Sequence, residues 1–209
     1  MYCSAWHQWN PCGPAAAYES LSPLLRPEAN VLDIGCGRGE TLAHLAASTN
    51  WHLWGIAPDT ASLFVGLPTH VTVLSAQAEA LPFPDGFFDA AIMECVFSLC
   101  RGREAAAEAA RVLAHGGRLL VTDLYSTTGI SRCFQGDGLV RRIYTEPELL
   151  ALFFSAGFAL RARHDGSQAM RAMFGQMILD GTACCLSVKE RQILRECRVG
   201  YGLWELELP

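Results

Sequence analysis

Short apolar runs recur along the chain, and segments with helical spacing separate them. Most of these runs lack regular polar alternation, which is typical of parallel strands buried on both faces of a sheet. The last run alternates apolar and polar residues, so we expect a closing strand with one partly exposed face. We expect about seven strands, at residues 30–35, 52–57, 70–75, 87–94, 118–124, 158–164 and 202–208.

The segments between the runs predict helices. Helical spacing extends over residues 15–25, 41–49, 103–114, 146–156, 169–179 and 188–197. His115-Gly116-Gly117 is expected to stop the third of these helices, and Gly157 the fourth. Because parallel strands need crossover connections, usually right-handed helices, the alternation predicts an α/β fold with a parallel sheet.

Composition narrows the class of protein. The chain has 209 residues, 51% of them hydrophobic and 18% charged, so we expect a single domain over 1–209. No apolar run reaches the roughly 20 residues that span a bilayer. Residues 1–13 show neither the basic start nor the apolar stretch of a signal peptide. We therefore expect a cytoplasmic protein without a membrane partner.

Charge and cysteine content argue against a nucleic-acid-binding protein and against a disulfide-bonded protein. The net charge is −5 and the arginines are scattered, which disfavours nucleic acid as a partner. The nine cysteines show no C-x-x-C spacing, and their odd number argues against a disulfide framework. Cys3, His7 and Cys12 are a weak candidate set of soft-metal ligands, because their spacing matches no standard zinc pattern. We predict no metal site.

The strongest chemical signal is the segment from Val31 to Gly39, VLDIGCGRG, which joins a buried strand to a helix. Gly35, Gly37 and Gly39 remove β-carbons where a ligand must approach the backbone closely. The spacing G-x-G-x-G differs from the G-x-G-x-x-G of a dinucleotide fingerprint. Taken alone, the motif is also compatible with a tight turn of packing glycines.

Four segments together resemble the class I S-adenosylmethionine (SAM)-dependent methyltransferases. VLDIGCGRGETLAHLA is similar to the first motif of that family, and AQAEALPFPDGFFDAAIMECV to its third and fourth motifs. ARVLAHGGRLLVTDLYS resembles the segment around its fifth strand, and YTEPELLALFFSAGF the helix and strand that follow. The matches cover residues 30–165 in the expected order. They look closest to the small-molecule branch that contains quinone-precursor and arsenite methyltransferases.

The resemblance implies SAM as the cofactor and a doubly wound, Rossmann-like fold. Its sheet is expected to be seven-stranded and mostly parallel, with an antiparallel C-terminal strand and helices on both faces. The resemblance also implies a subdivision of the chain: residues 1–27 form an N-terminal lid or helix, and residues 166–209 form a C-terminal extension.

The same resemblance places particular residues at the cofactor. Asp33 is expected at the amino group of the methionine part, Tyr18 at its carboxylate and Gln77 at the adenine. The expected cofactor contacts are Asp33, Gly35, Cys36, Gly37, Gly39, Ala57, Asp59, Gln77, Ala78, Glu94, Cys95 and Tyr18.

Ala57 departs from the family pattern. Near the end of the second strand the family usually has an acidic residue that binds both ribose hydroxyls. Asp59, two residues further on, substitutes for it if the loop bends. The alternative is that Asp59 only caps a short helix predicted at residues 61–65.

The acceptor side is assigned by position only. The expected acceptor contacts are Trp6, Trp9, Tyr125, Arg132, Cys133 and Tyr144. The two tryptophans either close over the site as a lid or anchor the N-terminus. No catalytic residue is identified, and Glu94 and His7 are the candidate bases if the acceptor needs one. Cys95 is either a thiol on the acceptor side or a small buried apolar residue.

These inferences predict a SAM-dependent methyltransferase that transfers a methyl group by in-line displacement to a small-molecule acceptor of unknown identity. Two alternatives stay open. One is a SAM-binding accessory or degenerate protein without catalysis, which Ala57 favours; the other is a methyltransferase for thiols or metalloids such as arsenite. The glycine spacing and Asp33 disfavour a nicotinamide-dependent oxidoreductase. Both a monomer and a homodimer are compatible with the sequence.

Overall fold

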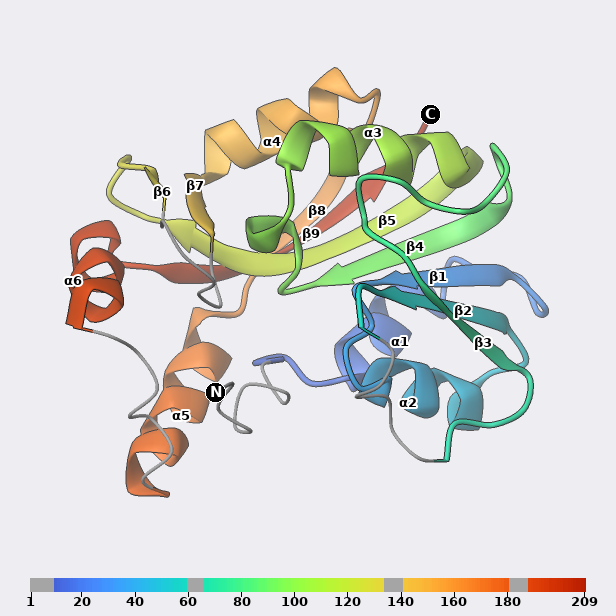
Figure 1. The fold of residues 1–209 in the computed structure, drawn as a ribbon, viewed down its shortest axis with the longest axis horizontal. Coiled ribbons are helices and arrows are strands. Elements are labelled where there is room, and N and C mark those ends of the chain that lie inside the picture. Colours follow the sequence, from blue (N-terminus) through green and yellow to red (C-terminus); the bar gives the residue numbers. More distant parts are fainter. Residues whose placement is uncertain (1–9, 60–65, 134–140, 181–187) are drawn as a thin grey trace.

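A β-sheet runs through the centre of the molecule in the computed structural model, which describes residues 10–59, 66–133, 141–180 and 188–209 (Figure 1). Its strands follow the order β3-β2-β1-β4-β5-β7-β6, while β9 pairs with β5 and β8 with β9. The strands are β1 (Asn30–Ile34), β2 (His52–Ala57), β3 (Val71–Ser75), β4 (Phe88–Glu94), β5 (Leu113–Ser126), β6 (Arg132–Cys133), β7 (Arg142–Thr145), β8 (Ala159–Asp165) and β9 (Gly200–Glu207).

The strand directions confirm the predicted topology. β1 is parallel to β2 and β4, β2 to β3, and β4 to β5. The last strand, β9, inserts antiparallel between β5 and β8, with Leu120 opposite Glu205 and His164 opposite Leu203. The doubly wound sheet with an antiparallel C-terminal strand is therefore confirmed. The described residues add β6 and β7, whose two and four residues are too few to stand out as apolar runs.

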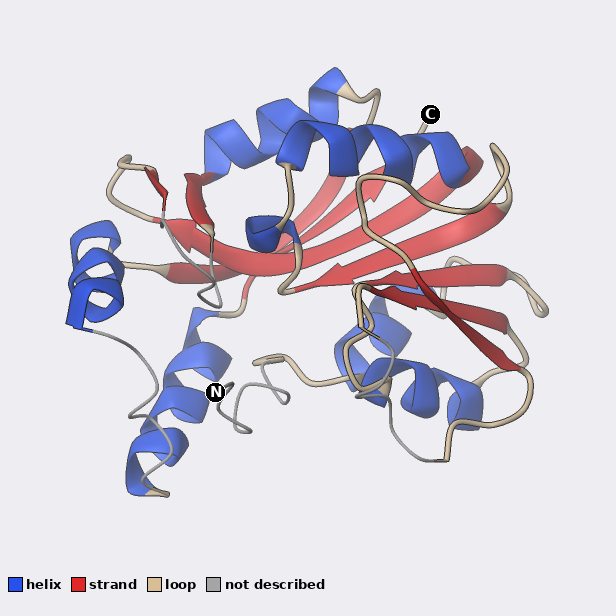
Figure 2. Cartoon of the chain, viewed as in Figure 1, coloured by secondary structure: helices blue, strands red, loops and turns tan. Residues whose placement is uncertain are grey.

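Helices cover both faces of the sheet (Figure 2). They are α1 (Ala15–Leu21), α2 (Glu40–Ser48), the short 3-10 helix η2 (Phe97–Leu99), α3 (Gly102–Val112), α4 (Glu146–Ser155), α5 (Ser167–Leu179) and α6 (Val188–Cys197). α3 and α4 lie on one face, and α1, α2 and α5 on the other. None of the helices in the described ranges combines the length and the apolar character needed to cross a membrane.

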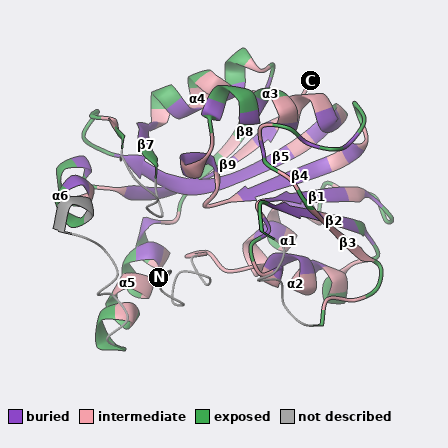
Figure 3. Cartoon of the chain, viewed as in Figure 1, coloured by how far each residue is buried: buried purple, intermediate pink, exposed green. Residues whose placement is uncertain are grey.

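The core consists of a layer on each face of the sheet (Figure 3). Side chains alternate between the faces along a strand. In β1, Leu32 and Ile34 therefore pack with α3 and α4, where Leu149 is also fully buried. Val31 points the other way and packs with Leu42 of α2. Strands buried on both faces explain why the apolar runs lack polar alternation.

One boundary prediction was wrong. The sequence predicted a helix to Ala114 with a stop at His115-Gly116-Gly117, but α3 ends at Val112 and β5 begins at the next residue. Gly116 has a φ of 78°, and its amide donates to the Leu208 carbonyl at 2.7 Å. The glycines therefore form an irregular start to β5, and the pairing register with β4 shifts there.

The first helix is also shorter than predicted. α1 ends at Leu21, whereas helical spacing continues to Leu25. Pro23 lacks an amide hydrogen, so the helical hydrogen-bond pattern cannot pass through it.

Candidate functional site

The turn after β1 approaches the segment after β4 closely. Gly35 has a φ of 83°, and a β-carbon there would lie 2.4 Å from a methyl carbon of Val96. Gly39, with a φ of 82°, caps α2. A β-carbon at Gly37 would meet no atom within 4 Å. The turn therefore presents open backbone at Gly37, while Gly35 lets the two segments pack together.

Two acids lie beside this turn on one face of the sheet. Val31 and Ile92 pack toward α1 and α2, so Asp33 and Glu94, two residues further along β1 and β4, share that face. Asp33 is only 3% exposed. Burial and the nearby Glu94 carboxylate raise the pKa of Asp33 well above its usual value. The neighbouring strand ends thus hold a pair of carboxyl groups, Asp33 buried and Glu94 half-buried.

Glu94 is held by two side chains from the N-terminal part of the chain. Asn10 donates from Nδ2 to Oε1 at 2.8 Å, and Thr41 donates from Oγ1 to Oε2 at 2.5 Å. Burial raises the pKa of Glu94, and these hydrogen bonds oppose the rise. The Asn10 Oδ1 is buried without a hydrogen-bond partner among the described residues. The acid pair is therefore bordered by a further acceptor that has no donor.

Cys95 follows Glu94 in a left-handed backbone conformation with a φ of 56°, which is uncommon for a non-glycine residue and frequent at functional sites. Its sulfur lies 3.3 Å from the Tyr201 hydroxyl, which donates to the Thr122 hydroxyl at 2.7 Å. Burial, followed by the Asp123 carboxylate, raises the pKa of the Cys95 thiol well above its usual value. The thiol is therefore protonated at neutral pH.

An apolar cluster adjoins this thiol under α5, and we call it the α5 cluster. It comprises Cys12, Cys95, Leu124, Met170, Phe174, Leu194, Val199 and Tyr201. A β-carbon at Gly166 would lie 3.0 Å from the Cys12 sulfur, so the segment before α1 packs against the start of α5. Burial and the Glu94 carboxylate raise the pKa of Cys12.

Asp123, near the end of β5, is a further acid at this edge of the sheet, and it is 1% exposed. Its Oδ2 accepts from the Ser98 amide and its Oδ1 from the Leu124 amide, both at 2.7 Å. Burial raises its pKa to about 6. Because backbone amides bind both oxygens, Asp123 fastens η2 to β5 rather than offering an open carboxylate.

The positions predicted to contact the ribose of SAM offer fewer polar groups than the turn after β1. Ala57 ends β2 and is 4% exposed, and Asp59 is exposed two residues further on. The predicted helix at 61–65 lies outside the described residues. The Cys36 sulfur points into the core, because a β-carbon at Gly55 would lie 2.9 Å from it. Burial raises the pKa of Cys36 to about 12.

The predicted adenine residues lie on the turn after β3. Gln77 is exposed and pairs with Ala80 through an isolated bridge, whereas Ala78 is buried. Tyr18 lies on α1 with its ring edge-on to His44 of α2, and the ring centroids are 6.3 Å apart. The structure thus places Gln77 and Ala78 together and Tyr18 on a separate helix.

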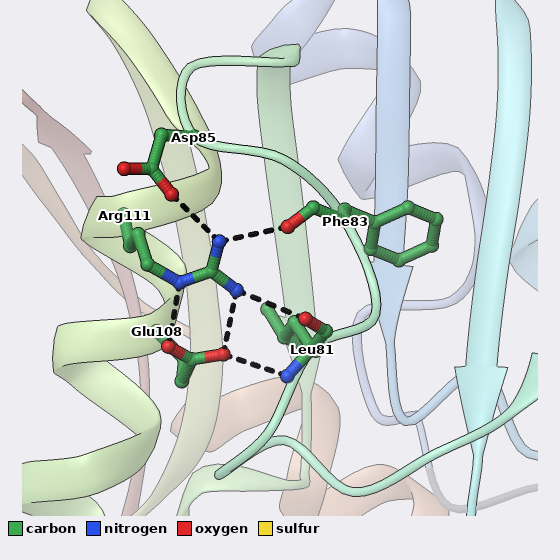
Figure 4. Close-up of polar contacts among 5 residues, drawn as sticks. All are labelled: Leu81, Phe83, Asp85, Glu108 and Arg111. Atoms are coloured by element: carbon green, nitrogen blue, oxygen red, sulfur yellow. Dashed lines mark hydrogen bonds and ion pairs between the residues drawn. The ribbon is translucent and has the colours of Figure 1, made fainter.

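Arg111 of α3 fixes the loop that leads from this turn to β4 (Figure 4). Its guanidinium donates to the carbonyls of Phe83 (2.7 Å) and Leu81 (2.9 Å) and to the Asp85 carboxylate (2.8 Å). Glu108 accepts from Arg111 and also from the Leu81 amide. Loop and helix are therefore held by a fully paired group of charges.

Two predicted acceptor residues are used in packing. The Tyr125 hydroxyl accepts from Arg163 at 2.6 Å, and its ring lies edge-on to Trp204. Tyr144 packs against Phe97, on the face covered by α3 and α4. The structure does not bring either tyrosine to the acid pair, and their role at an acceptor stays a prediction.

The other acceptor predictions also lie apart from the pair or outside the description. Arg132 forms an ion pair with Glu196 at 3.5 Å, and the Cys133 sulfur accepts from Arg142 at 3.2 Å. Trp6, His7 and Trp9 lie outside the described residues. Within the described part of the chain, no group of three or more His, Cys, Asp or Glu residues is arranged to hold a metal ion.

Sequence reasoning missed three residues that shape this site: Asn10, Thr41 and Tyr201. Thr41 could have been found from its place in the first turn after the glycines. Asn10 and Tyr201 carry no local signal, because only the folded chain brings them to Glu94 and Cys95.

Known proteins share both the sequence pattern and the fold. Residues 32–121 match a family described as "Methyltransferase domain". An O-methyltransferase of Pyrenophora dematioidea is 27% identical over 72% of this chain and 62% of its own length. A malonyl-[acyl-carrier protein] O-methyltransferase of Herminiimonas arsenicoxydans is 30% identical over 69% and 57%. A demethylmenaquinone methyltransferase of Mycolicibacterium gilvum is 32% identical over 61% and 53%. The chain therefore spans roughly half to three-fifths of these relatives' lengths.

Solved structures share the architecture at low identity. Geranyl diphosphate C-methyltransferase of Streptomyces coelicolor, in complex with S-adenosyl-L-homocysteine (SAH), superimposes with a TM-score of 0.74 at 17% identity, covering 93% of this chain and 79% of that one. A 1,6-didemethyltoxoflavin-N1-methyltransferase of Burkholderia thailandensis, also with bound SAH, gives 0.70 at 19% identity, covering 98% and 81%. Residues 32–121 therefore match a methyltransferase domain, and the chain shares its fold with these two solved methyltransferases.

Proposed function

We propose that this protein transfers a methyl group from SAM to a small-molecule acceptor by in-line displacement. The observation that carries the proposal is the site beside the glycine turn. There, the backbone is open at Gly37, on the turn that directly follows the strand carrying the buried Asp33, and the half-buried Glu94 ends the neighbouring strand. The methyltransferase domain and the SAH complexes of similar folds support SAM as the cofactor.

The described residues fit the methionine part of SAM. A zwitterionic amino acid needs donors for its carboxylate and acceptors for its ammonium group. The glycine turn offers backbone without side chains, and the acids offer acceptors. Asp33 meets the amino group in this arrangement, and the turn from Gly35 to Gly39 lies along the methionine chain.

The adenosine part has weaker support. Gln77 and Ala78 lie on the turn after β3, and the paired charges around Arg111 hold the loop that follows. Ala57 offers no ribose carboxylate, so Asp59 is the substitute within this proposal. The affinity for adenosine alone is therefore expected to be low, and the methionine part supplies most of the selectivity.

The chemistry requires little from the protein beyond placement. SAM supplies an activated methyl group when bound. The chain's own residues orient the reactants and exclude water, which together account for several kcal/mol of the barrier. The α5 cluster includes Cys95, which directly follows β4, and we propose that this cluster lines the binding site of the methyl acceptor. A base is needed only for acceptors that lose a proton, and Glu94 is the candidate among the described residues.

The acceptor is proposed to be an uncharged carbon, oxygen or nitrogen nucleophile. Acids surround the α5 cluster: Glu94 raises the pKa of Cys12, and Asp123 and Glu94 raise that of Cys95. The thiols of Cys12 and Cys95 stay protonated, which disfavours their use as thiolate ligands for a metalloid. Either a monomer or a homodimer suits this proposal, and light scattering of the purified protein distinguishes them.

Calorimetric titration of the reduced protein with SAM and SAH tests the proposal. We expect binding of both ligands, and formation of SAH when SAM is incubated with a panel of quinols and phenols. Asp33→Ala is the control that should bind neither ligand. If the wild-type protein bound neither SAM nor SAH, the proposal would be abandoned. Binding without any SAH formation across the panel would favour an accessory protein without catalysis.

A further inference from the structure

The segment after β4, residues 95–99, lies between the glycine turn and the end of β5. A β-carbon at Gly35 would lie 2.4 Å from a methyl carbon of Val96, so this segment packs directly against the turn. On its other side, the Cys95 amide donates to the Thr122 carbonyl of β5 at 2.7 Å. The 95–99 segment therefore separates the glycine turn from β5.

Asp123 fixes the far end of the 95–99 segment. The Ser98 amide donates to its Oδ2 and the Leu124 amide to its Oδ1, both at 2.7 Å. The Ser98 carbonyl accepts from the amide of Arg141, the residue before β7, at 3.2 Å. One carboxylate thus ties η2 to β5, and η2 in turn contacts β7.

The backbone that Asp123 holds carries two members of the α5 cluster. They are Leu124, whose amide donates to Asp123, and Cys95, three residues before Ser98. Asp123 itself points to the other face of the sheet. Val121, two residues back, packs with α3 and α4, and side chains alternate along a strand. Asp123 therefore acts on the proposed acceptor site through the backbone, without touching the acceptor.

A carboxylate is a costly anchor at this position. Asp123 is 1% exposed, and the salt bridges of the described residues do not include it. Burial raises its pKa to about 6, so the ionised group lowers the free energy of unfolding at neutral pH relative to a neutral side chain. Strongly perturbed pKa values are concentrated at functional sites. Stability alone therefore does not explain this aspartate.

The hydrogen bonds explain why a carboxylate is used. Two backbone amides and the Ser98 hydroxyl converge on Asp123 as donors. A carboxylate accepts at both oxygens, whereas the side chain of an asparagine accepts at its oxygen and donates from its nitrogen. The ionised aspartate therefore holds Ser98 and Leu124 together, which a neutral side chain of the same shape does less well.

Resting on the proposed function, we propose that Asp123 is a positioning residue for methyl transfer. It keeps the 95–99 segment at the place, between the glycine turn and the α5 cluster, that aligns the acceptor with the methyl group of SAM. In-line displacement needs this alignment, and a misplacement of about 1 Å lowers a rate about 100-fold. Loss of the carboxylate should therefore lower turnover, while Asp33 and Glu94, the acids proposed at the cofactor, keep their contacts.

Protonation of Asp123 should act like its replacement. It puts a hydrogen on one oxygen, which then faces amide donors, so one of the two bonds weakens. On β9, the residue opposite Asp123 is Gly202, which does not titrate. The titratable or charged side chains around Asp123 and η2 are Cys95, Cys100, Glu79, Arg141 and Tyr144. Burial is the main cause that raises the pKa values of the two thiols and of Tyr144, so these three groups stay neutral. Turnover should therefore fall as the pH falls through the Asp123 pKa of about 6.

The test measures SAH formation between pH 5 and 8 with the phenol or quinol that reacts fastest in the panel. For the wild-type protein we expect kcat to fall below about pH 6. Asp123→Asn should lower kcat at pH 8 about tenfold or more and should lack the fall near pH 6. Its Kd for SAM, measured by calorimetry, should stay unchanged. Asp89→Asn is the matched control, because Asp89 also binds a backbone amide, that of Asn30 at 2.8 Å, but at the opposite edge of the sheet.

Hydrogen exchange followed by mass spectrometry gives a readout that needs no acceptor. In the wild-type protein with bound SAH, peptides covering residues 95–100 should exchange about fivefold faster at pH 5 than at pH 8, after correction for the intrinsic pH dependence. Asp123→Asn should show the faster exchange at both pH values. The wild-type pH series for kcat and for exchange requires no variant, so it decides the question if circular dichroism shows that Asp123→Asn does not fold.

Three outcomes would contradict this role of Asp123. An unchanged kcat in Asp123→Asn would show that the anchor has no effect on methyl transfer. Parallel losses of kcat and SAM affinity, or faster exchange throughout the chain, would reduce Asp123 to a structural residue. If the wild-type protein formed no SAH from SAM with any acceptor, the proposed function itself would be wrong, and the role of Asp123 in it would fall as well.

Discussion

Two groups of acids on opposite faces of the sheet show how differently a fold can use carboxylates. Glu108 and Asp85 surround Arg111, and each makes hydrogen bonds to it. Asp33 and Glu94 lie at strand ends without any arginine or lysine partner among the described residues. The first group closes a loop onto a helix. The second leaves acceptors without a charged partner, and for this reason we propose it as the ligand site.

The largest expected effect is on cofactor affinity. Asp33→Asn should weaken SAM binding by about 100-fold, because a charge-assisted hydrogen bond to the ammonium group becomes a neutral one. The free energy of unfolding at pH 8 should not fall, because the variant removes a buried, unpaired charge. Titration calorimetry and urea denaturation measure the two quantities. A loss of stability in parallel with affinity would contradict the comparison.

The paired group should show the reverse pattern. Arg111→Ala should lower the free energy of unfolding by about 2 kcal/mol, because the Leu81 and Phe83 carbonyls lose their donor. SAM affinity should change much less than in Asp33→Asn. Arg103→Ala is the matched control, since Arg103 is an exposed arginine on the same helix. Urea denaturation of both variants provides the measurement.

The two groups should also respond to pH with opposite signs. Arg111 lowers the pKa of Glu108. The ionised Glu108 therefore adds to the free energy of unfolding above its ordinary pKa, and this addition is lost as the pH falls through the lowered pKa. Burial raises the pKa of Asp123 to about 6. The protonated Asp123 therefore favours the folded state fully below the ordinary pKa of an aspartate, and this effect on the free energy of unfolding is lost as the pH rises through about 6.

The test for this contrast is the free energy of unfolding between pH 3 and 8. Asp123→Asn should flatten the decline in the free energy of unfolding between about pH 4 and 6, and Glu108→Gln the decline on the acid side, each by on the order of 1 kcal/mol or more. Identical pH profiles for wild type and both variants would refute the assignment of these signs.

The smallest effect is expected at Tyr201. Tyr201→Phe removes its hydrogen bonds to Cys95 and Thr122, which should lower the free energy of unfolding by about 1 kcal/mol or less. SAM affinity should stay unchanged, since neither acid contacts this hydroxyl by a hydrogen bond. A large loss of SAM affinity would extend the ligand site into the α5 cluster.

The fold could be predicted from local patterns because each buried strand and each helix repeats a simple period. The mostly parallel sheet and the antiparallel last strand followed from the family resemblance and are confirmed. The end of α3 was missed because the Gly116-Gly117 pair signals a helix stop and a strand irregularity equally well. Only the pairing of Gly116 with Leu208 shows which of the two it forms.

The site was predictable only where its residues lie on the motif itself. Asp33 and Glu94 lie at the ends of predicted strands, and Gly35 directly follows one of them. Their place at the carboxyl edge of the sheet therefore followed from the pattern. Asn10 reaches Glu94 from 84 residues away. Tyr125 was predicted at the acceptor from its position after β5 alone; its hydroxyl accepts a hydrogen bond from Arg163, and its role at an acceptor stays a prediction.

The insertion of β9 between β5 and β8 has a consequence for synthesis on the ribosome. While residues 127–199 are being added, the edge of β5 that will pair with β9 lacks that partner. Unpaired edges invite wrong pairing, and contacts between distant segments form slowly. The nascent chain can acquire its glycine turn early, whereas Tyr201 joins Cys95 only at the end. Until β9 has been made, the nascent chain therefore exposes a strand edge at β5 to which chaperones have access.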